Sequence, residues 1–181
     1  AVDVMLEAQL AAAASVRPEV EAIAKAADEA AARLKSGGRL VYAGAGTSGR
    51  IAVQDGVELG PTFGWPIERI AFIIAGGVGA LSKSAEFAED DPNAAREQLA
   101  AINLSPSDIL IGVAASGRTP FTLGAIEFGN EVGALTIGIV NNRASDIHEA
   151  ANIGICAETG SEVIAGSTRM KAGTAQKIIL N

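Results

Sequence analysis

The sequence of 181 residues contains one cysteine, few aromatic side chains and no long uninterrupted hydrophobic run. The single Cys156 excludes a disulfide within one chain, which favours a reducing compartment, and we expect a cytoplasmic protein. Because no apolar run reaches about 18 residues, we expect no membrane span. The start of the sequence lacks a basic segment followed by an apolar one, so we expect no signal peptide.

Positive charge is also scarce, and the formal net charge is −7. This charge argues against nucleic acid and against an anionic membrane surface as partners. A phosphorylated small molecule is not excluded, because a few backbone N–H groups can hold one phosphate whatever the net charge is. The lone His148, the lone Cys156 and the scattered acids show no metal-ligand spacing, so we expect no metal site.

The first 36 residues are rich in alanine and carry charges at helical spacing. Pro18 predicts the end of one helix and the start of another. We therefore divide the chain into an N-terminal helical segment, residues 1–36, and a single domain, residues 37–181. The helical pattern at 178–181 has no stop signal, so we expect that part of a longer chain is missing at the end.

Five apolar segments alternate with helical segments in the larger region. They predict strands over 39–43, 69–75, 108–114, 135–140 and 152–157. Helices are predicted from the turn at 44–48 to about residue 58, and over 80–90, 92–102, 120–132, 144–150 and from about 168. Near-continuous apolar strands are typical of a parallel sheet buried on both faces. The alternation predicts an α/β fold, a doubly wound three-layer αβα sandwich with a five-stranded parallel sheet.

Three turns of this predicted fold combine glycine, hydroxyl side chains, an arginine and a helix start, at 44–50, 115–120 and 166–173. Glycine lets the backbone approach an anion closely, and a helix N-terminus presents free N–H groups and partial positive charge. Each turn alone is also compatible with an ordinary helix cap. Three together favour an anion site at the carboxyl ends of the strands, where ligands bind in such folds.

A dinucleotide site is the main alternative for the first turn. Gly44, Gly46 and Gly49 have the spacing of that fingerprint, but no acidic residue ends the second strand about 20 residues later. The adjacent hydroxyls of Thr47 and Ser48 suit a monophosphate better.

Two glutamates follow the turns and differ in their surroundings. Glu58 lies between apolar and turn residues with no basic partner nearby, which makes it a candidate acid or base. Glu89 lies in an acidic stretch, where the simplest interpretation is a solvated helix end.

The longest motif reads Gly-Ser-Thr-Arg-Met-Lys-Ala-Gly-Thr-Ala-Gln-Lys over 166–177. With the segments at 38–50, 61–64, 74–77, 88–90 and 114–120, it resembles the sugar isomerase (SIS) family. More narrowly, it resembles the N-acetylmuramic acid 6-phosphate etherases. The resemblance covers residues 37–181, and the last motif is long and specific.

The resemblance implies a lyase that removes the D-lactyl ether from carbon 3 of N-acetylmuramic acid 6-phosphate, without metal or cofactor. In the open-chain sugar, the C1 aldehyde acidifies the C2 proton, which a base removes. The C3 oxygen then leaves with help from an acid, and water adds back. The products are N-acetylglucosamine 6-phosphate and D-lactate.

The resemblance also implies roles for particular residues. Glu58 matches the proton donor, and Glu89 matches the second catalytic carboxylate, which replaces the solvated-end interpretation. The members of the family are homodimers with sites close to the subunit interface. The implied phosphate and sugar ligands are Thr47, Ser48, Ser116, Gly117, Arg118, Thr119, Ser167 and Thr168.

The chain departs from the family's usual pattern, and two alternative functions remain. From the resemblance we expect that the family's region ahead of the first helix and its helical C-terminal portion are missing from this sequence. The family usually has Asp-Ala-Ser where this chain has Asp55-Gly56-Val57, and Pro-Pro where it has Gly60-Pro61. A non-catalytic sugar-phosphate sensor of the same fold would not need both glutamates. An aldose–ketose isomerase of the same fold would need one base and no acid for lactate.

Overall fold

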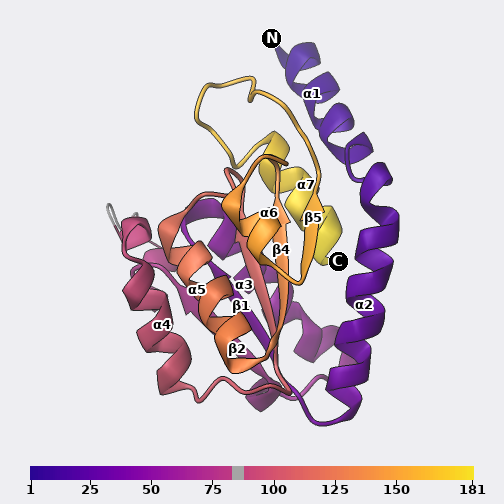
Figure 1. The fold of residues 1–181 in the computed structure, drawn as a ribbon. Coiled ribbons are helices and arrows are strands. Elements are labelled where there is room, and N and C mark those ends of the chain that lie inside the picture. The colour runs from indigo at the N-terminus through magenta and orange to yellow at the C-terminus, as the bar shows by residue number, and fades with distance from the viewer. Residues whose placement is uncertain (83–87) are drawn as a thin grey trace.

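The computed structural model describes residues 1–82 and 88–181, which form three layers around a parallel sheet (Figure 1). The described strands pair in the order β2-β1-β3-β4-β5, all in parallel. They are β1 (Leu40–Gly44), β2 (Ile70–Ile74), β3 (Ile109–Ala114), β4 (Leu135–Val140) and β5 (Ile153–Cys156). Each lies within or next to a predicted apolar segment, so the predicted α/β fold with a five-stranded parallel sheet is confirmed.

Helices cover both faces of the sheet. One face packs against α2 (Val20–Lys35), α3 (Gly46–Phe63) and α7 (Lys171–Leu180). The other packs against α4 (Pro92–Ala101), α5 (Pro120–Val132) and α6 (Asp146–Ala150). Tyr42 belongs to the core of the first face and Val41 to that of the second. Side chains of successive strand residues point to opposite faces, so a strand buried on both needs an uninterrupted apolar sequence.

The N-terminal segment consists of α1 (Val2–Ala14), the 3₁₀ turn η1 (Arg17–Glu19) and α2. The break falls at Pro18, as the sequence predicts. Helix α1 packs against α7, beyond the end of the sheet (Figure 1). One side of this helix carries the exposed apolar side chains of Val2, Leu6 and Leu10, and Val4 is exposed as well.

Three predicted boundaries differ from the structure. Helix α3 does not end near Glu58 but continues through Pro61 to Phe63, and the left-handed Gly64 (φ 65°) ends it. Helix α7 begins at Lys171, three residues after the predicted start. The helix predicted over 80–90 is represented by the 3₁₀ turns η3 (Val78–Leu81) and η4 (Ala88–Asp90), and residues 83–87 lie outside the described residues. A further 3₁₀ turn, η2 (Ile67–Arg69), precedes β2.

Candidate functional site

The three glycine- and hydroxyl-rich turns meet at the carboxyl edge of the sheet. They surround a cavity of about 270 Å³. The turn after β1, the turn after β3 and the turn before α7 all contribute to its wall. The lining residues are Ala45, Gly46, Thr47, Ser48, Glu89, Ala115, Ser116, Thr119, Gly166 and Thr168. The fold therefore brings together five of the eight predicted ligand residues and one of the two predicted glutamates.

Two helix N-termini face this cavity, which is called the smaller cavity below. Helix α3 follows Ala45 and α5 follows Thr119, and neither residue makes a side-chain cap hydrogen bond. The first N–H groups of a helix have no partner within the helix and carry partial positive charge. With the hydroxyls of Thr47, Ser48 and Ser116 beside them, these groups form a suitable environment for one phosphate.

Gly117 gives the turn after β3 its shape. Its φ is +67°, a left-handed conformation that glycine adopts without strain. A Cβ at this position would lie 2.2 Å from the Oγ of Ser145, which is itself buried. The backbone of Gly117 is also fixed, because its carbonyl accepts the N–H of Ile147 at 3.0 Å. No side chain fits here, so Gly117 can contribute only backbone atoms to a ligand.

The arginines of the first two turns donate hydrogen bonds to backbone carbonyls of the protein. Arg118 donates from its guanidinium to the carbonyl of Ala144 at 3.1 Å. Arg50 donates to the carbonyls of Ala80 and Leu81 at 2.9 to 3.2 Å. Both guanidinium groups thus fix loops at the rim of the site.

Glu89 lies at the exposed rim of the smaller cavity, in η4. The chain after it is well fixed, because Asp91 caps α4 by accepting the N–H groups of Asn93 and Ala94 at 2.9 and 3.3 Å. At Gly124 in α5, a Cβ would lie 2.5 Å from the carbonyl oxygen of Pro92. This close packing of α4 on α5 sets the approach of Glu89 to the turn at Thr119.

Glu58 does not line this cavity. It lies ten residues after Ser48 on α3, about 15 Å along the helix axis, since each residue adds about 1.5 Å. Its side chain is exposed. The carboxylate one turn earlier, Asp55, is buried and paired with Lys177 of α7. Within one chain, the structure therefore separates the two predicted glutamates.

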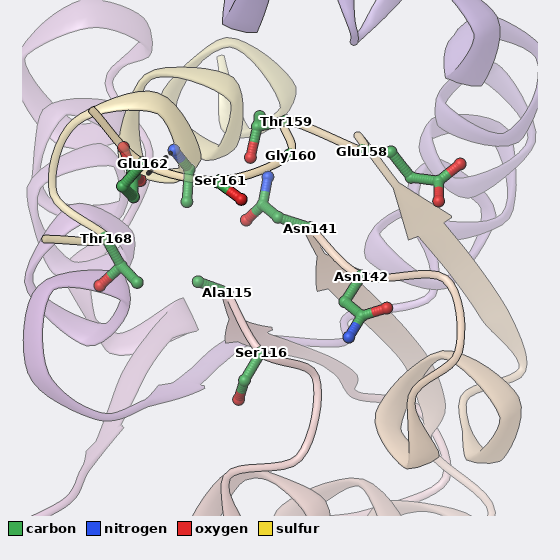
Figure 2. A pocket seen from close by; sticks show the side chains of 11 residues that line it. Ala115, Ser116, Asn141, Asn142, Glu158, Thr159, Gly160, Ser161, Glu162 and Thr168 are labelled. Atoms are coloured by element: carbon green, nitrogen blue, oxygen red, sulfur yellow. Dashed lines mark hydrogen bonds between the residues drawn. The ribbon is translucent and has the colours of Figure 1, made fainter. Parts of the chain in front are cut away.

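A second cavity of about 480 Å³ adjoins the first and shares Ala115, Ser116 and Thr168 with it (Figure 2). The sequence analysis did not select the rest of its wall: Asn141, Asn142, Glu158, Thr159, Gly160, Ser161, Glu162 and Ala172. These residues follow β4 and β5 or begin α7, at the same edge of the sheet. The rule that ligands bind at the carboxyl ends of parallel strands was the signal that could have found them.

The start of α7 differs from the other two helix starts. The Glu162 carboxylate accepts the N–H groups of Lys171 and Ala172, at 2.9 and 3.0 Å. This N-terminus is therefore already bound to an anion from the protein. Ser167 lines neither cavity, whereas Thr168 lines both.

Cys156 is a core residue, as the sequence predicts, and burial raises the pKa of its thiol to about 11. Over residues 1–82 and 88–181, no group of three or more His, Cys, Asp or Glu side chains is arranged to hold a metal ion. In the same part of the chain, no helix has the length and apolar character needed to cross a membrane.

Two family models match the chain. Residues 22–130 match the glucokinase regulatory protein N-terminal SIS domain, and residues 80–181 match the SIS domain. Both matches include turns of the site described above.

Several known proteins with similar sequences are N-acetylmuramic acid 6-phosphate etherases. The chain is 51% identical over 180 residues to the N-acetylmuramic acid 6-phosphate etherase of Lactobacillus acidophilus, covering 99% of this chain and 60% of that protein. It is 49% identical over 173 residues to the etherase of Deinococcus radiodurans, covering 96% of this chain and 57% of that protein. The chain thus spans less than two thirds of the length of these relatives.

Solved structures with lower identity share the fold. A phosphoheptose isomerase from Neisseria gonorrhoeae aligns with a TM-score of 0.73 at 16% identity, covering 99% of this chain and 91% of that one. The Vibrio vulnificus NanR protein, complexed with ManNAc-6P, aligns with a TM-score of 0.68 at 13% identity, covering 99% and 58%. The chain therefore belongs to the SIS domain family, and its sequence groups it with the N-acetylmuramic acid 6-phosphate etherases.

Proposed function

We propose that this chain is the catalytic SIS domain of an etherase that acts on N-acetylmuramic acid 6-phosphate in the cytoplasm. The observation that carries the proposal is the smaller cavity. It combines two open helix N-termini, a set of hydroxyls and the carboxylate of Glu89. The identity of about half of all residues to etherases favours this reaction over others of the same fold.

The 6-phosphate is held at the starts of α3 and α5. Thr47, Ser48, Ser116 and Thr119 supply hydroxyls, and Gly117 supplies backbone. Anchoring one end of a flexible open-chain sugar leaves its C2 and C3 atoms at a defined distance from the anchor. Thr168, which also lines this cavity, contacts the sugar.

The reaction requires four proton transfers: from C2, to the leaving lactyl oxygen, from the added water, and back to C2. A base takes the proton from C2, the bond between C3 and the lactyl oxygen breaks, and an acid protonates that oxygen as D-lactate leaves. Water adds its oxygen to C3, and C2 regains a proton. Glu58 is the proton donor and Glu89 the second carboxylate, and each positioned group contributes about 10²- to 10⁴-fold to the rate.

The separation of the two glutamates within one chain leads us to include a homodimer in the proposal. In it, Glu58 of a second copy approaches the cavity that holds Glu89. Glu58 is exposed and does not line the cavity of its own chain, which supports this arrangement. The exposed apolar side of α1 offers surface for the contact between copies.

The test is release of D-lactate from N-acetylmuramic acid 6-phosphate, with Glu58→Gln and Glu89→Gln beside the wild type. We expect each variant to retain the fold and to lose at least about 10²-fold in rate. A folded wild type that releases no lactate contradicts the etherase function. Undiminished release by both variants contradicts the roles of the glutamates.

Mixing the two inactive variants tests the homodimer. If the glutamates act across the interface, a mixed dimer contains one intact site, and activity reappears when the variants are combined and exchange subunits. If both act within one chain, every site carries one substitution and no activity returns.

The separation of the glutamates also favours a second candidate, a non-catalytic sugar-phosphate sensor. The Vibrio vulnificus NanR protein, which shares this fold, has been solved in complex with ManNAc-6P. A sensor would bind N-acetylglucosamine 6-phosphate equally well in the wild type and in Glu58→Gln, and would release no lactate.

A further inference from the structure

Glu162 closes the N-terminus of α7 in the wall of the larger cavity (Figure 2). Its Oε2 accepts the N–H of Lys171 at 2.9 Å, and its Oε1 accepts the N–H of Ala172 at 3.0 Å. The residue at the cap position, Met170, makes no side-chain cap hydrogen bond. A carboxylate from nine residues earlier in the chain therefore takes the place of the missing cap.

A second hydrogen bond joins the loop before α7 to the start of the helix. The Nζ of Lys171 donates to the carbonyl of Ser161 at 3.0 Å, so both neighbours in the pair 161–162 contact the start of α7. Between these contacts lies the turn at 166–170. The N–H of Gly173 donates to the carbonyl of Thr168 at 2.9 Å, which joins this turn directly to the helix that Glu162 caps.

The start of α7 also packs closely on the start of α3. A Cβ at Gly173 would lie 3.0 Å from Cδ1 of Ile51 and 3.9 Å from Cγ2 of Thr47. Thr47 and Thr168 thus lie on neighbouring elements, and both line the smaller cavity. Any movement of the first turn of α7 moves Thr168 relative to Thr47.

We propose that Glu162 is a positioning residue for the sugar phosphate. By binding the N-terminus of α7, it holds the turn at 166–170, and with it Thr168, in the wall between the two cavities. It also occupies the one helix N-terminus of the three that would otherwise attract the phosphate away from α3 and α5. This inference rests on the proposed function, in which Thr168 contacts the sugar.

The test compares Glu162→Ala with Glu158→Ala. Glu158 lines the same cavity, but its side chain is 61% exposed and its carboxylate pairs with Arg143 at 3.4 Å and caps no helix, so it is a matched control. We expect Glu162→Ala to speed amide hydrogen exchange over residues 166–172. It should also weaken the binding of N-acetylglucosamine 6-phosphate about five- to tenfold, as the loss of a helix cap would. Glu158→Ala should change neither quantity.

Formate distinguishes a positioning carboxylate from general loss of packing. Formate can enter the space that the Glu162 side chain leaves, so added formate should restore slow exchange and sugar-phosphate affinity in Glu162→Ala, with no gain in the wild type. Glu162→Gln keeps one acceptor oxygen and should lie between the wild type and Glu162→Ala. If Glu162→Ala does not fold, Glu162→Gln replaces it in the exchange and affinity measurements.

Two results overturn the inference: unchanged exchange over 166–170 in Glu162→Ala, or faster exchange with unchanged affinity. Hydrogen exchange and equilibrium binding can be measured in a protein that does not catalyse the reaction. A wild type that binds the sugar phosphate but releases no lactate therefore contradicts the etherase function while leaving the role of Glu162 intact.

Discussion

The amino edge and the carboxyl edge of the sheet use polar groups in different ways. At the amino edge, Arg39 donates to the buried carboxylate of Asp108 at 2.7 Å and to the carbonyl of Asn103 at 3.1 Å. Arg69 likewise donates to the carbonyls of Leu34 and Gly38. At the carboxyl edge, two helix N-termini and a row of hydroxyls face a cavity. At the amino edge, the guanidinium groups of Arg39 and Arg69 are satisfied within the protein, whereas the carboxyl edge keeps several polar groups available for a ligand.

This difference predicts that stability and binding respond to substitutions at opposite edges. Breaking a satisfied buried network lowers the free energy of unfolding. Removing a group that faces a cavity lowers affinity for whatever occupies it, with little effect on folding.

The largest expected effect on stability is at Asp108. Its carboxylate accepts hydrogen bonds from Arg39 and Ser105 and is 1% exposed. We expect Asp108→Ala to lower the free energy of unfolding by about 3 kcal/mol, because it leaves the Arg39 guanidinium without its partner. Urea denaturation measures this loss. The exposed pair of Arg96 and Glu131 supplies the control, and Glu131→Ala should have no measurable effect.

A substitution at Gly117, at the carboxyl edge, should affect both stability and binding. We expect Gly117→Ala to lower the free energy of unfolding by about 2 kcal/mol, from backbone strain and the clash with Ser145. It should also weaken sugar-phosphate binding, since the turn must move. Gly46 has φ +53° but open space around a Cβ, so Gly46→Ala should cost only about 1 kcal/mol. Equal losses in the two variants would contradict the role given to Ser145.

The amino edge should also show a characteristic pH dependence. Burial raises the pKa of Asp108, but the hydrogen bonds from Arg39 and Ser105 outweigh it and hold the pKa below its ordinary value. The carboxylate therefore contributes its full stabilisation above about pH 4, the pKa in the unfolded chain, and loses it as the pH falls through the lower folded value. Urea midpoints of the wild type and Asp108→Asn should differ at pH 5–8 and converge in acid. A constant difference at every pH would exclude this linkage.

The smallest effect is expected at the carboxyl edge, at Thr119. Its hydroxyl caps no helix N–H, so Thr119→Ala should leave stability unchanged. The variant should bind N-acetylglucosamine 6-phosphate about five- to tenfold more weakly, the usual result of losing one hydrogen bond to a charged group. Calorimetry measures the affinity. Ser161→Ala, in the wall of the larger cavity, is the control and should bind normally.

The sequence predicted most of this arrangement because its signals are local. Buried parallel strands require apolar runs, and helix α5 begins and ends where Pro120 and Gly133 predict. Thr47, Ser116 and Thr119 could be assigned to one edge because each follows a strand. Glu89 joined them only through the family resemblance, since its own surroundings predicted a solvated helix end.

The parts that the sequence did not predict depend on the path of the chain in space. Nothing in the spacing of Glu162 indicates that its side chain reaches back to cap α7. Helix α3 continues past Pro61 and ends at the left-handed Gly64, so the glycine and not the proline sets its end. The distance of Glu58 from Glu89 follows from that continuous helix, and no local pattern contains it.

The central claim, elimination of lactate followed by addition of water, is tested most directly by carrying out the reaction in ¹⁸O-labelled D₂O. The account predicts ¹⁸O on C3 of N-acetylglucosamine 6-phosphate, deuterium on C2, and unlabelled D-lactate. Label in the ether oxygen position of lactate would mean that the bond on the lactyl side breaks, and would contradict the proposed chemistry of this site.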